Sequence, residues 1–335
     1  GYCVRVLSNS DYKLIERLVS LSQKGMHEAM SHFLKARYDN NVIVTKDYIV
    51  AIGDIPIALV AHMDTVFKTP VSDLYYDQRK GVLWSPQGLG ADDRAGIFAI
   101  MKIIESGLRP SVILTTDEEQ GGLGATALAS QKCPIPNLKY MIQLDRHGTN
   151  DCVFYECFNE DFYDYVESFG FVEAYGSFSD ISFLMPQWLV CGVNLSVGYE
   201  DEHSDVETLH IAPLFDTIRK VQEMLLDAEN AVEFEYDELV FSSRGSSWWR
   251  NVMIYGQHCS HCNKLYSEYE LFPVIGIDKK TKFYCPDCIV GNVDWCDTCG
   301  EAFEIEDPAK NEKICKICAE VVCTTSEKSK NNSAK

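Results

Sequence analysis

Five short polar segments of this 335-residue chain carry the side chains best suited to chemistry. Each lies where an apolar run ends, and together they hold two histidines and several carboxylates: His62-Met-Asp64, Gly90-Ala-Asp92-Asp93, Asp117-Glu118-Glu119, Leu144-Asp145-Arg146 and Glu202-His203-Ser204. Neutral imidazole and carboxylate oxygen suit Zn²⁺, and also Mn²⁺ or Co²⁺. The set predicts a site for two metal ions, of the kind that hydrolases use.

The first two segments each have a structural alternative. His62 and Asp64 share a face at a strand end, so His62 can bind metal while Asp64 accepts its other N–H and fixes the tautomer. The alternative is a hydrogen-bonded core histidine with a solvated aspartate. Asp92 and Asp93 stand among glycines before a helix, where the alternative is helix capping. Two adjacent aspartates exceed what a cap needs, which favours a carboxylate that bridges two metals.

The acidic run at Glu118 and Glu119 is the strongest catalytic signal. One glutamate can bind metal while its neighbour takes a proton from metal-bound water. The alternative is a solvated helix start, but charges directly after a buried strand are unfavourable unless they meet water or cations. Asp145 follows a buried strand in the same way, with a capping or solvated aspartate as its alternative. His203 alone would be interpreted as a surface histidine in an acidic loop.

The apolar runs predict strands alternating with helices. Strands are expected in a hairpin over 41–53 and then at 55–61, 111–116, 138–144 and 188–196, and helices at 10–25, 93–106 and 211–228. This alternation predicts an α/β fold with a mixed, largely parallel sheet covered by helices on both faces. Ligands bind at the carboxyl ends of strands in such sheets, where four of the five segments lie; the fifth opens a helix.

The order of these motifs resembles that of the co-catalytic di-zinc exopeptidases. H-x-D, G-x-x-D-D-x-x-G, D-E-E, a lone Asp and H-S follow one another over roughly residues 40–228. These enzymes include peptidase T, its carboxypeptidase and deacylase relatives, and the bacterial leucyl aminopeptidases. Residues 61–66 and 89–97 are especially similar to peptidase T.

The resemblance implies a role for each metal ligand. Asp92 would bridge two zinc ions. His62 and Asp145 would complete one site, and Glu119 and His203 the other.

The resemblance also implies roles for residues that do not bind metal. Glu118 would be the general base, Asp64 would orient His62, and the Asp92-Asp93 peptide would be cis.

One departure concerns the lid or dimerisation domain that peptidase T inserts between the lone Asp and the last His. The interval between Asp145 and His203 is too short for it, so the catalytic domain resembles the single-domain aminopeptidases more closely. In that branch a tyrosine shortly before a Ser-Asp pair helps to polarise the scissile carbonyl. Tyr175, which precedes Ser179-Asp180, is the matching residue.

Fourteen cysteines are present, and their distribution argues against a disulfide framework. Eight form C-x-x-C pairs, a zinc spacing that fits a reducing compartment: Cys259, Cys262, Cys285, Cys288, Cys296, Cys299, Cys315 and Cys318. Sequential pairing gives two zinc ribbons, and interleaved pairing is the alternative. His258, His261 and Cys323 are further candidate ligands.

These patterns divide the chain into four parts. Residues 1–241 form the catalytic domain, 242–256 a linker, 257–323 tandem zinc ribbons and 324–335 a disordered tail. The ribbons carry fewer basic than acidic residues. Their aromatic residues either pack the small cores or contact a protein partner, a second copy or the active site.

Charge and hydropathy limit the function further. The net charge of −20 argues against nucleic-acid and membrane-surface binding, since both partners are anionic. No apolar run reaches membrane-spanning length and the N-terminal residues lack a secretory signal, so a cytoplasmic location is expected.

The sequence therefore predicts a zinc-dependent exopeptidase with two catalytic and two structural zinc ions. An aminopeptidase that attacks small peptides through a metal-bound hydroxide is the first hypothesis. An N-acyl amino acid or metabolite amidohydrolase is the second. A non-catalytic protein that binds partners through its ribbons is the third.

Overall fold

The computed structural model describes residues 6–229, 233–236, 257–266, 271–298, 301–306, 313–316 and 318–319. The chain divides into two compact units, Gly1–Val240 and Phe241–Lys335. The expected linker over 242–256, the expected tail over 324–335, Cys299 and Cys323 lie outside the described residues.

The first unit is built on an eight-stranded sheet in the order β1-β2-β6-β3-β7-β10-β8-β9. Its strands are β1 (Val42–Val44), β2 (Tyr48–Ala51), β3 (Ile55–His62), β6 (Pro110–Thr115), β7 (Tyr140–Arg146), β8 (Asp151–Val153), β9 (Val172–Glu173) and β10 (Cys191–Ser196). The four central strands β6, β3, β7 and β10 are parallel, whereas β2 and β8 pair antiparallel to their inner neighbours. The central strands are buried almost throughout, as strands covered on both faces must be.

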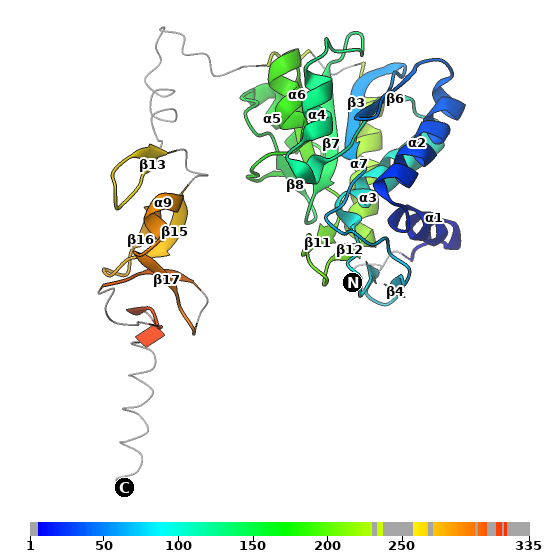
Figure 1. Cartoon of the computed structure of the whole chain (residues 1–335). Helices are drawn as coiled ribbons and strands as arrows, with labels where there is room; N and C mark the ends of the chain where they lie inside the picture. The colour runs from blue at the N-terminus through cyan, green and yellow to red at the C-terminus, as the bar shows by residue number, and fades with distance from the viewer. Residues whose placement is uncertain are drawn as a thin grey trace. The chain divides into compact units, whose positions relative to one another are not determined.

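Helices cover both faces of this sheet (Figure 1). They are α1 (Asn9–Val19), α2 (Gln23–Tyr38), α3 (Ala91–Glu105), α4 (Leu123–Ala129), α5 (Glu160–Glu167), α6 (Asp180–Trp188) and α7 (Ile211–Leu226). The chain moves from β3 to β6 through α3, and back across β3 to β7 through α4. Because parallel crossovers are right-handed, α3 and α4 lie on opposite faces. α7 packs with α3, and α6 packs with α4. The fold predicted from the sequence is confirmed.

Two predicted elements were wrong. The helix expected over 10–25 is two helices, because α1 ends at Val19 and Ser22 starts α2 by accepting a hydrogen bond from the Gly25 N–H. Gly25 therefore lies in the first turn of α2 and does not end a helix. The strand expected to begin at Trp188 begins at Cys191, because Trp188 ends α6.

No helix within the described ranges is long and apolar enough to cross a membrane.

A second, smaller sheet holds the segment that carries His203. Its strands are β11 (Tyr199–Glu200), β12 (Thr208–His210), β5 (Val82–Trp84) and β4 (Tyr75–Asp77), in that order. β12 pairs antiparallel with β5, which precedes α3. The loop between β11 and β12 is thereby anchored to the chain that leads into Asp92.

The second unit contains a four-stranded sheet in the order β16-β15-β18-β17. Its elements are β15 (Phe272–Ile275), β16 (Thr281–Tyr284), α9 (Pro286–Ile289), β17 (Val293–Trp295) and β18 (Ala302–Glu304), with a separate pair of β13 (Gln257–His258) and β14 (Leu265–Tyr266). Two antiparallel hairpins meet where Ile275 pairs with Phe303. Glu304 of β18 adds two hydrogen bonds between the hairpins. Its carboxylate accepts the Tyr284 hydroxyl of β16 at 2.5 Å and the Ile277 N–H, just after β15, at 3.0 Å.

Candidate active site

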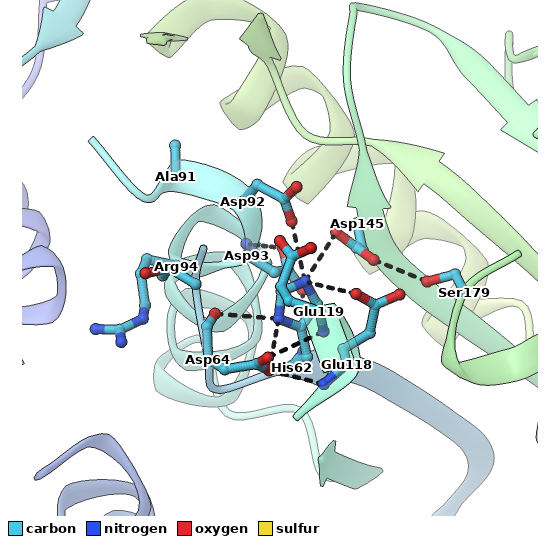
Figure 2. Close-up of polar contacts among 12 residues, drawn as sticks. His62, Asp64, Ala91, Asp92, Asp93, Arg94, Glu118, Glu119, Asp145 and Ser179 are labelled. Atoms are coloured by element: carbon cyan, nitrogen blue, oxygen red, sulfur yellow. Dashed lines mark hydrogen bonds and ion pairs between the residues drawn. The ribbon is translucent and has the colours of Figure 1, made fainter. Parts of the chain in front are cut away.

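Five separate elements bring the predicted side chains together at one edge of the main sheet. His62 is the last residue of β3, and Asp145 lies at the end of β7. The 3₁₀ turn η1 (Glu118–Gln120) follows β6, Asp92 opens α3, and His203 lies between β11 and β12. Figure 2 shows the carboxylates of Asp92, Asp145, Glu118 and Glu119 converging on His62.

Asp92 lies between the two histidines. Its Oδ1 atom is 2.9 Å from Nε2 of His62, and its Oδ2 atom is 3.0 Å from Nε2 of His203. One carboxylate thus presents an oxygen to each imidazole, which is the geometry that a bridging ligand needs.

Each histidine has a second carboxylate beside the same nitrogen. Nε2 of His62 lies 3.5 Å from Oδ1 of Asp145, and Nε2 of His203 lies 2.9 Å from Oε1 of Glu119. The groups therefore form two sets that share Asp92: one contains His62 and Asp145, and the other contains His203 and Glu119.

Glu118 lies beside these sets. Its Oε2 atom is 3.9 Å from Nε2 of His62, and its side chain is almost fully buried. No imidazole within the described residues is closer to this carboxyl group. This leaves Glu118 next to the shared centre rather than inside either set.

Asp64 contacts the other ring nitrogen of His62. Its Oδ1 atom lies 3.2 Å from Nδ1 of His62, so Nε2 is the nitrogen left facing the carboxylates. The same carboxylate accepts the backbone N–H groups of Glu118 and Glu119, both at 3.0 Å. Asp64 thereby fixes the ring of His62 and the segment that carries both glutamates.

Asp92 and Asp93 have different tasks. The peptide bond between them is cis, as the resemblance implied. Asp93 is fully buried, and its carboxylate accepts the backbone N–H groups of His62 at 3.2 Å and Gly96 at 3.0 Å. Asp93 is close enough to His62 and Asp145 to count as a metal ligand by distance alone. Because both of its oxygens already hold backbone groups, we interpret Asp93 as the helix cap and Asp92 as the ligand.

Close backbone packing sets the distance between α3 and β7. A Cβ atom on Gly96 would lie 2.1 Å from the carbonyl oxygen of Leu144, so only glycine fits there. This contact places the start of α3 directly beside Asp145.

Burial and crowding shift the acids of the site. Burial, reinforced by neighbouring carboxylates, raises the pKa of Glu118 to about 9, of Glu119 to about 7 and of Asp145 to about 6. Hydrogen bonding to Asp92 raises the pKa of His203 to about 9. Without cations, Glu118 and His203 would hold protons at neutral pH, and Glu119 would be partly protonated. Two imidazoles and a cluster of carboxylates therefore form a donor set that fits two divalent cations, which would replace those protons.

Residues that the sequence interpretation did not assign support Asp145. Its carboxylate accepts hydrogen bonds from the hydroxyls of Ser179 at 2.8 Å and Tyr199 at 3.1 Å, and from the side-chain amide of Gln143 at 3.3 Å. Gln143 also donates to Asp180, a buried carboxyl group whose pKa burial raises to about 7. In the sequence, the Ser179-Asp180 pair serves only to identify Tyr175 and predicts no contact with Asp145.

Glu207 is a second unassigned residue. It is fully buried, and its carboxylate accepts the backbone N–H groups of Ala91 at 3.1 Å and Asp92 at 3.3 Å. Its position four residues after His203 was the signal available in the sequence, but a lone glutamate after a loop has many structural explanations.

Tyr175 does not share the burial of the other predicted residues. Its side chain is 77% exposed, whereas Ser179, four residues later, is buried against Asp145. The role predicted for Tyr175 in polarising the carbonyl stays a prediction.

The cysteines of the second unit form two clusters. Sulfur atoms of Cys259, Cys262, Cys285 and Cys288 lie within 4.8 Å of one another, as do those of Cys296, Cys315 and Cys318. These groups follow the sequential arrangement. Cys299, the fourth ligand expected for the second cluster, lies outside the described residues.

Backbone groups around the first cluster favour thiolate. Burial raises the pKa of the Cys259 thiol. Hydrogen bonds from the backbone N–H groups of Cys262, Cys285 and His261 outweigh this effect and lower the pKa to about 6. Thiolate is the form that binds zinc.

Comparison with known proteins supports the same class. Residues 41–163 match the model of Peptidase family M28, a range that contains every predicted catalytic segment except that of His203. None of the curated proteins matches the chain.

Two solved structures share the fold. A tripeptidase from Staphylococcus aureus subsp. aureus Mu50 is 13% identical, with a TM-score of 0.52 over 68% of this chain and 100% of the other. A TET aminopeptidase from the marine sediment archaeon Thaumarchaeota archaeon SCGC AB-539-E09 is 14% identical, with a TM-score of 0.51 over 67% of this chain and 99% of the other.

The family match, the fold and the convergent site define a metallohydrolase of the co-catalytic zinc exopeptidase superfamily. The resemblance found in the sequence is thus confirmed for the superfamily. The second unit adds cysteine clusters after this catalytic core.

Proposed function

We propose that the protein is a zinc-dependent aminopeptidase that removes N-terminal residues from small peptides. The observation that carries the proposal is the position of Glu118, a buried carboxyl group with a raised pKa beside two histidine–carboxylate sets. A proton shuttle must lie within reach of the attacking water and have a pKa near the working pH, toward which bound cations would lower the pKa of Glu118. That both solved structures described above are named as peptidases supports peptides as substrates.

The proposed ligands of the cation pair are the five residues of the two sets. Asp92 would bridge the ions, His62 and Asp145 would complete one site, and His203 and Glu119 the other. When bound, the ions supply Lewis-acid activation of water and of the scissile carbonyl. Mn²⁺ or Co²⁺ would suit the same catalytic ligands.

Glu118 would accept a proton from the attacking water and deliver it to the leaving amine. Asp64 holds the backbone N–H of Glu118, so the carboxyl group is fixed relative to His62. Burial excludes bulk water from the carboxyl group and keeps its proton affinity high.

A deacylase of N-acyl amino acids or metabolites is the second candidate, because it would use the same ligands and the same base. A third is a partner-binding protein that makes no use of its site. The intact set of ligands around Glu118 disfavours this third candidate.

One experiment separates the three. The zinc-loaded full chain is assayed against aminoacyl-anilides and, in parallel, against N-acyl amino acids. Turnover of the anilides alone supports the aminopeptidase, and turnover of the acylated compounds alone supports the deacylase. Turnover of neither, with two catalytic cations bound, would support the binding protein.

For the second unit we propose two structural zinc ions, one per cysteine cluster. The C-x-x-C spacing of these cysteines suits a reducing compartment, and we propose the cytoplasm. Exposed Trp295 and Phe272 suit contact with a protein partner or with a second copy of the chain.

A further inference from the structure

Glu207 is a buried carboxylate that the proposed reaction does not use. It has no exposed surface, and each of its oxygens accepts one backbone N–H, from Ala91 at 3.1 Å and from Asp92 at 3.3 Å. The groups that Glu207 holds are the backbone N–H groups of Asp92, the proposed bridging residue, and of Ala91 before it.

Glu207 is not needed to cap α3. The backbone of Asp92 and Asp93 is non-helical, and regular helix begins only after them. The Asp93 carboxylate caps that helix by accepting the Gly96 N–H at 3.0 Å. Glu207 therefore acts on the non-helical segment that precedes the cap, where helix formation offers these N–H groups no partner.

Glu207 also lies on the same loop as a metal ligand. His203 is four residues earlier, and β12 begins at the next residue, Thr208, which pairs with Trp84 of β5. The loop therefore contacts Asp92 at two places. His203 lies 3.0 Å from its carboxylate, and Glu207 accepts a hydrogen bond from its backbone N–H.

We propose that Glu207 is a positioning residue for the cation pair: it fixes the backbone of Asp92 relative to His203 so that one carboxylate can serve both ions. The inference rests on the proposed function, since it assumes that Asp92 bridges two cations. Glu207 touches neither substrate nor cations, and acts through Asp92.

The test measures the affinity of the full chain for Zn²⁺ by competition with a chromophoric chelator. Glu207→Gln keeps the shape of the side chain but replaces one accepting oxygen with an amide that cannot accept an N–H. Affinity at the catalytic sites should fall at least about tenfold, the range for residues that orient metal ligands. Asp205→Asn removes an exposed carboxylate from the same loop and should leave the affinity unchanged. The cysteine clusters are common to all the proteins, so differences report the catalytic pair.

Three readouts distinguish the outcomes. Raising the Zn²⁺ concentration should restore the activity of Glu207→Gln, because the variant is defective in holding cations. A lowered thermal midpoint of the metal-free variant with unchanged Zn²⁺ affinity would show a merely structural role and overturn the inference. If the unmodified chain binds no catalytic cation pair, the proposed function itself fails. If it binds the pair and Glu207→Gln binds it equally well, only the role of Glu207 fails.

Discussion

The carboxylate of Asp64 contacts both the ring of His62 and the segment that carries Glu118 and Glu119. Its Oδ1 atom is 3.2 Å from Nδ1 of His62 and 3.0 Å from the backbone nitrogen of Glu118, while Oδ2 accepts the N–H of Glu119. The orientation of the His62 ring and the position of the Glu118–Glu119 segment therefore both depend on Asp64, whose backbone carbonyl oxygen also lies 3.1 Å from Nδ1 of His62.

Replacing Asp64 should weaken both functions. In Asp64→Ala, Nδ1 of His62 keeps the backbone carbonyl oxygen of residue 64 at 3.1 Å but loses the carboxylate, and two backbone N–H groups lose their acceptor. We expect Zn²⁺ affinity at the catalytic sites to fall about 10- to 100-fold. Turnover should stay below that of the unmodified chain even when Zn²⁺ saturates the sites. Chelator competition and turnover at saturating Zn²⁺ measure the two effects. Asp54→Ala, at an exposed aspartate before β3, is the control; equal behaviour of the two variants would contradict the assigned role.

Replacing Glu118 should separate catalysis from cation binding. Glu118→Gln keeps the size of the side chain but removes its ability to accept a proton. Turnover should fall by at least about 10²-fold, the lower range for general acid–base catalysis. Metal analysis should find both catalytic ions still bound, because Glu118 belongs to neither ligand set. Near-normal turnover would assign proton transfer to another group.

The same variant should change the pH dependence of stability in the metal-free protein. Burial raises the pKa of Glu118 from its ordinary 4.5 to about 9 in the folded chain. The folded state therefore binds this proton more tightly than the unfolded state, and its stabilising effect is lost as pH rises from about 4.5 to about 9. Glutamine resembles the protonated acid at every pH.

Thermal unfolding of chelator-treated protein measures this difference. The midpoint should fall less steeply between pH 5 and pH 9 in Glu118→Gln than in the unmodified chain. The variant should be the more stable of the two near pH 9, and the cysteine clusters cancel in the comparison. Parallel curves for the two proteins would show that Glu118 titrates normally.

The number of bound cations should depend on His62. Metal analysis of the purified full chain should find four zinc equivalents if both cysteine clusters and both proposed catalytic sites are filled. His62→Ala should lower the count, whereas His147→Ala, at a half-exposed histidine paired with Glu202 at 2.7 Å, should not. An unchanged count in His62→Ala, with only two ions in the unmodified chain, would refute the di-metal site.

Sequence patterns were most informative where chemistry coincides with a strand end. His62 and Asp145 follow long apolar runs, so their convergence could be predicted from the topology of a parallel sheet. Glu207 could not be found this way, because its role depends on pairing between β12 and β5, two short strands far apart in sequence. The break between α1 and α2 was missed for a local reason: the apolar spacing continues across Ser22, and only its hydrogen bond to Gly25 marks a new helix start.

Removal of the second unit tests what its cysteine clusters and exposed aromatic residues contribute. A chain ending at Val240 keeps the whole first unit and all five ligands, so it should fold and bind its catalytic cations. Trp295 is 55% exposed and Phe272 50% exposed, which favours a contact surface on the removed part. If these residues join copies of the chain or approach the active site, truncation should lower the mass in solution or the activity on peptides. Light scattering and anilide assays measure both, with Trp295→Ala in the full chain as the matched variant.

Unchanged mass and activity would leave contact with another protein as the proposed role. Tight, salt-dependent binding of the isolated second unit to DNA or RNA would contradict a protein-contact role, since the ribbons carry fewer basic than acidic residues.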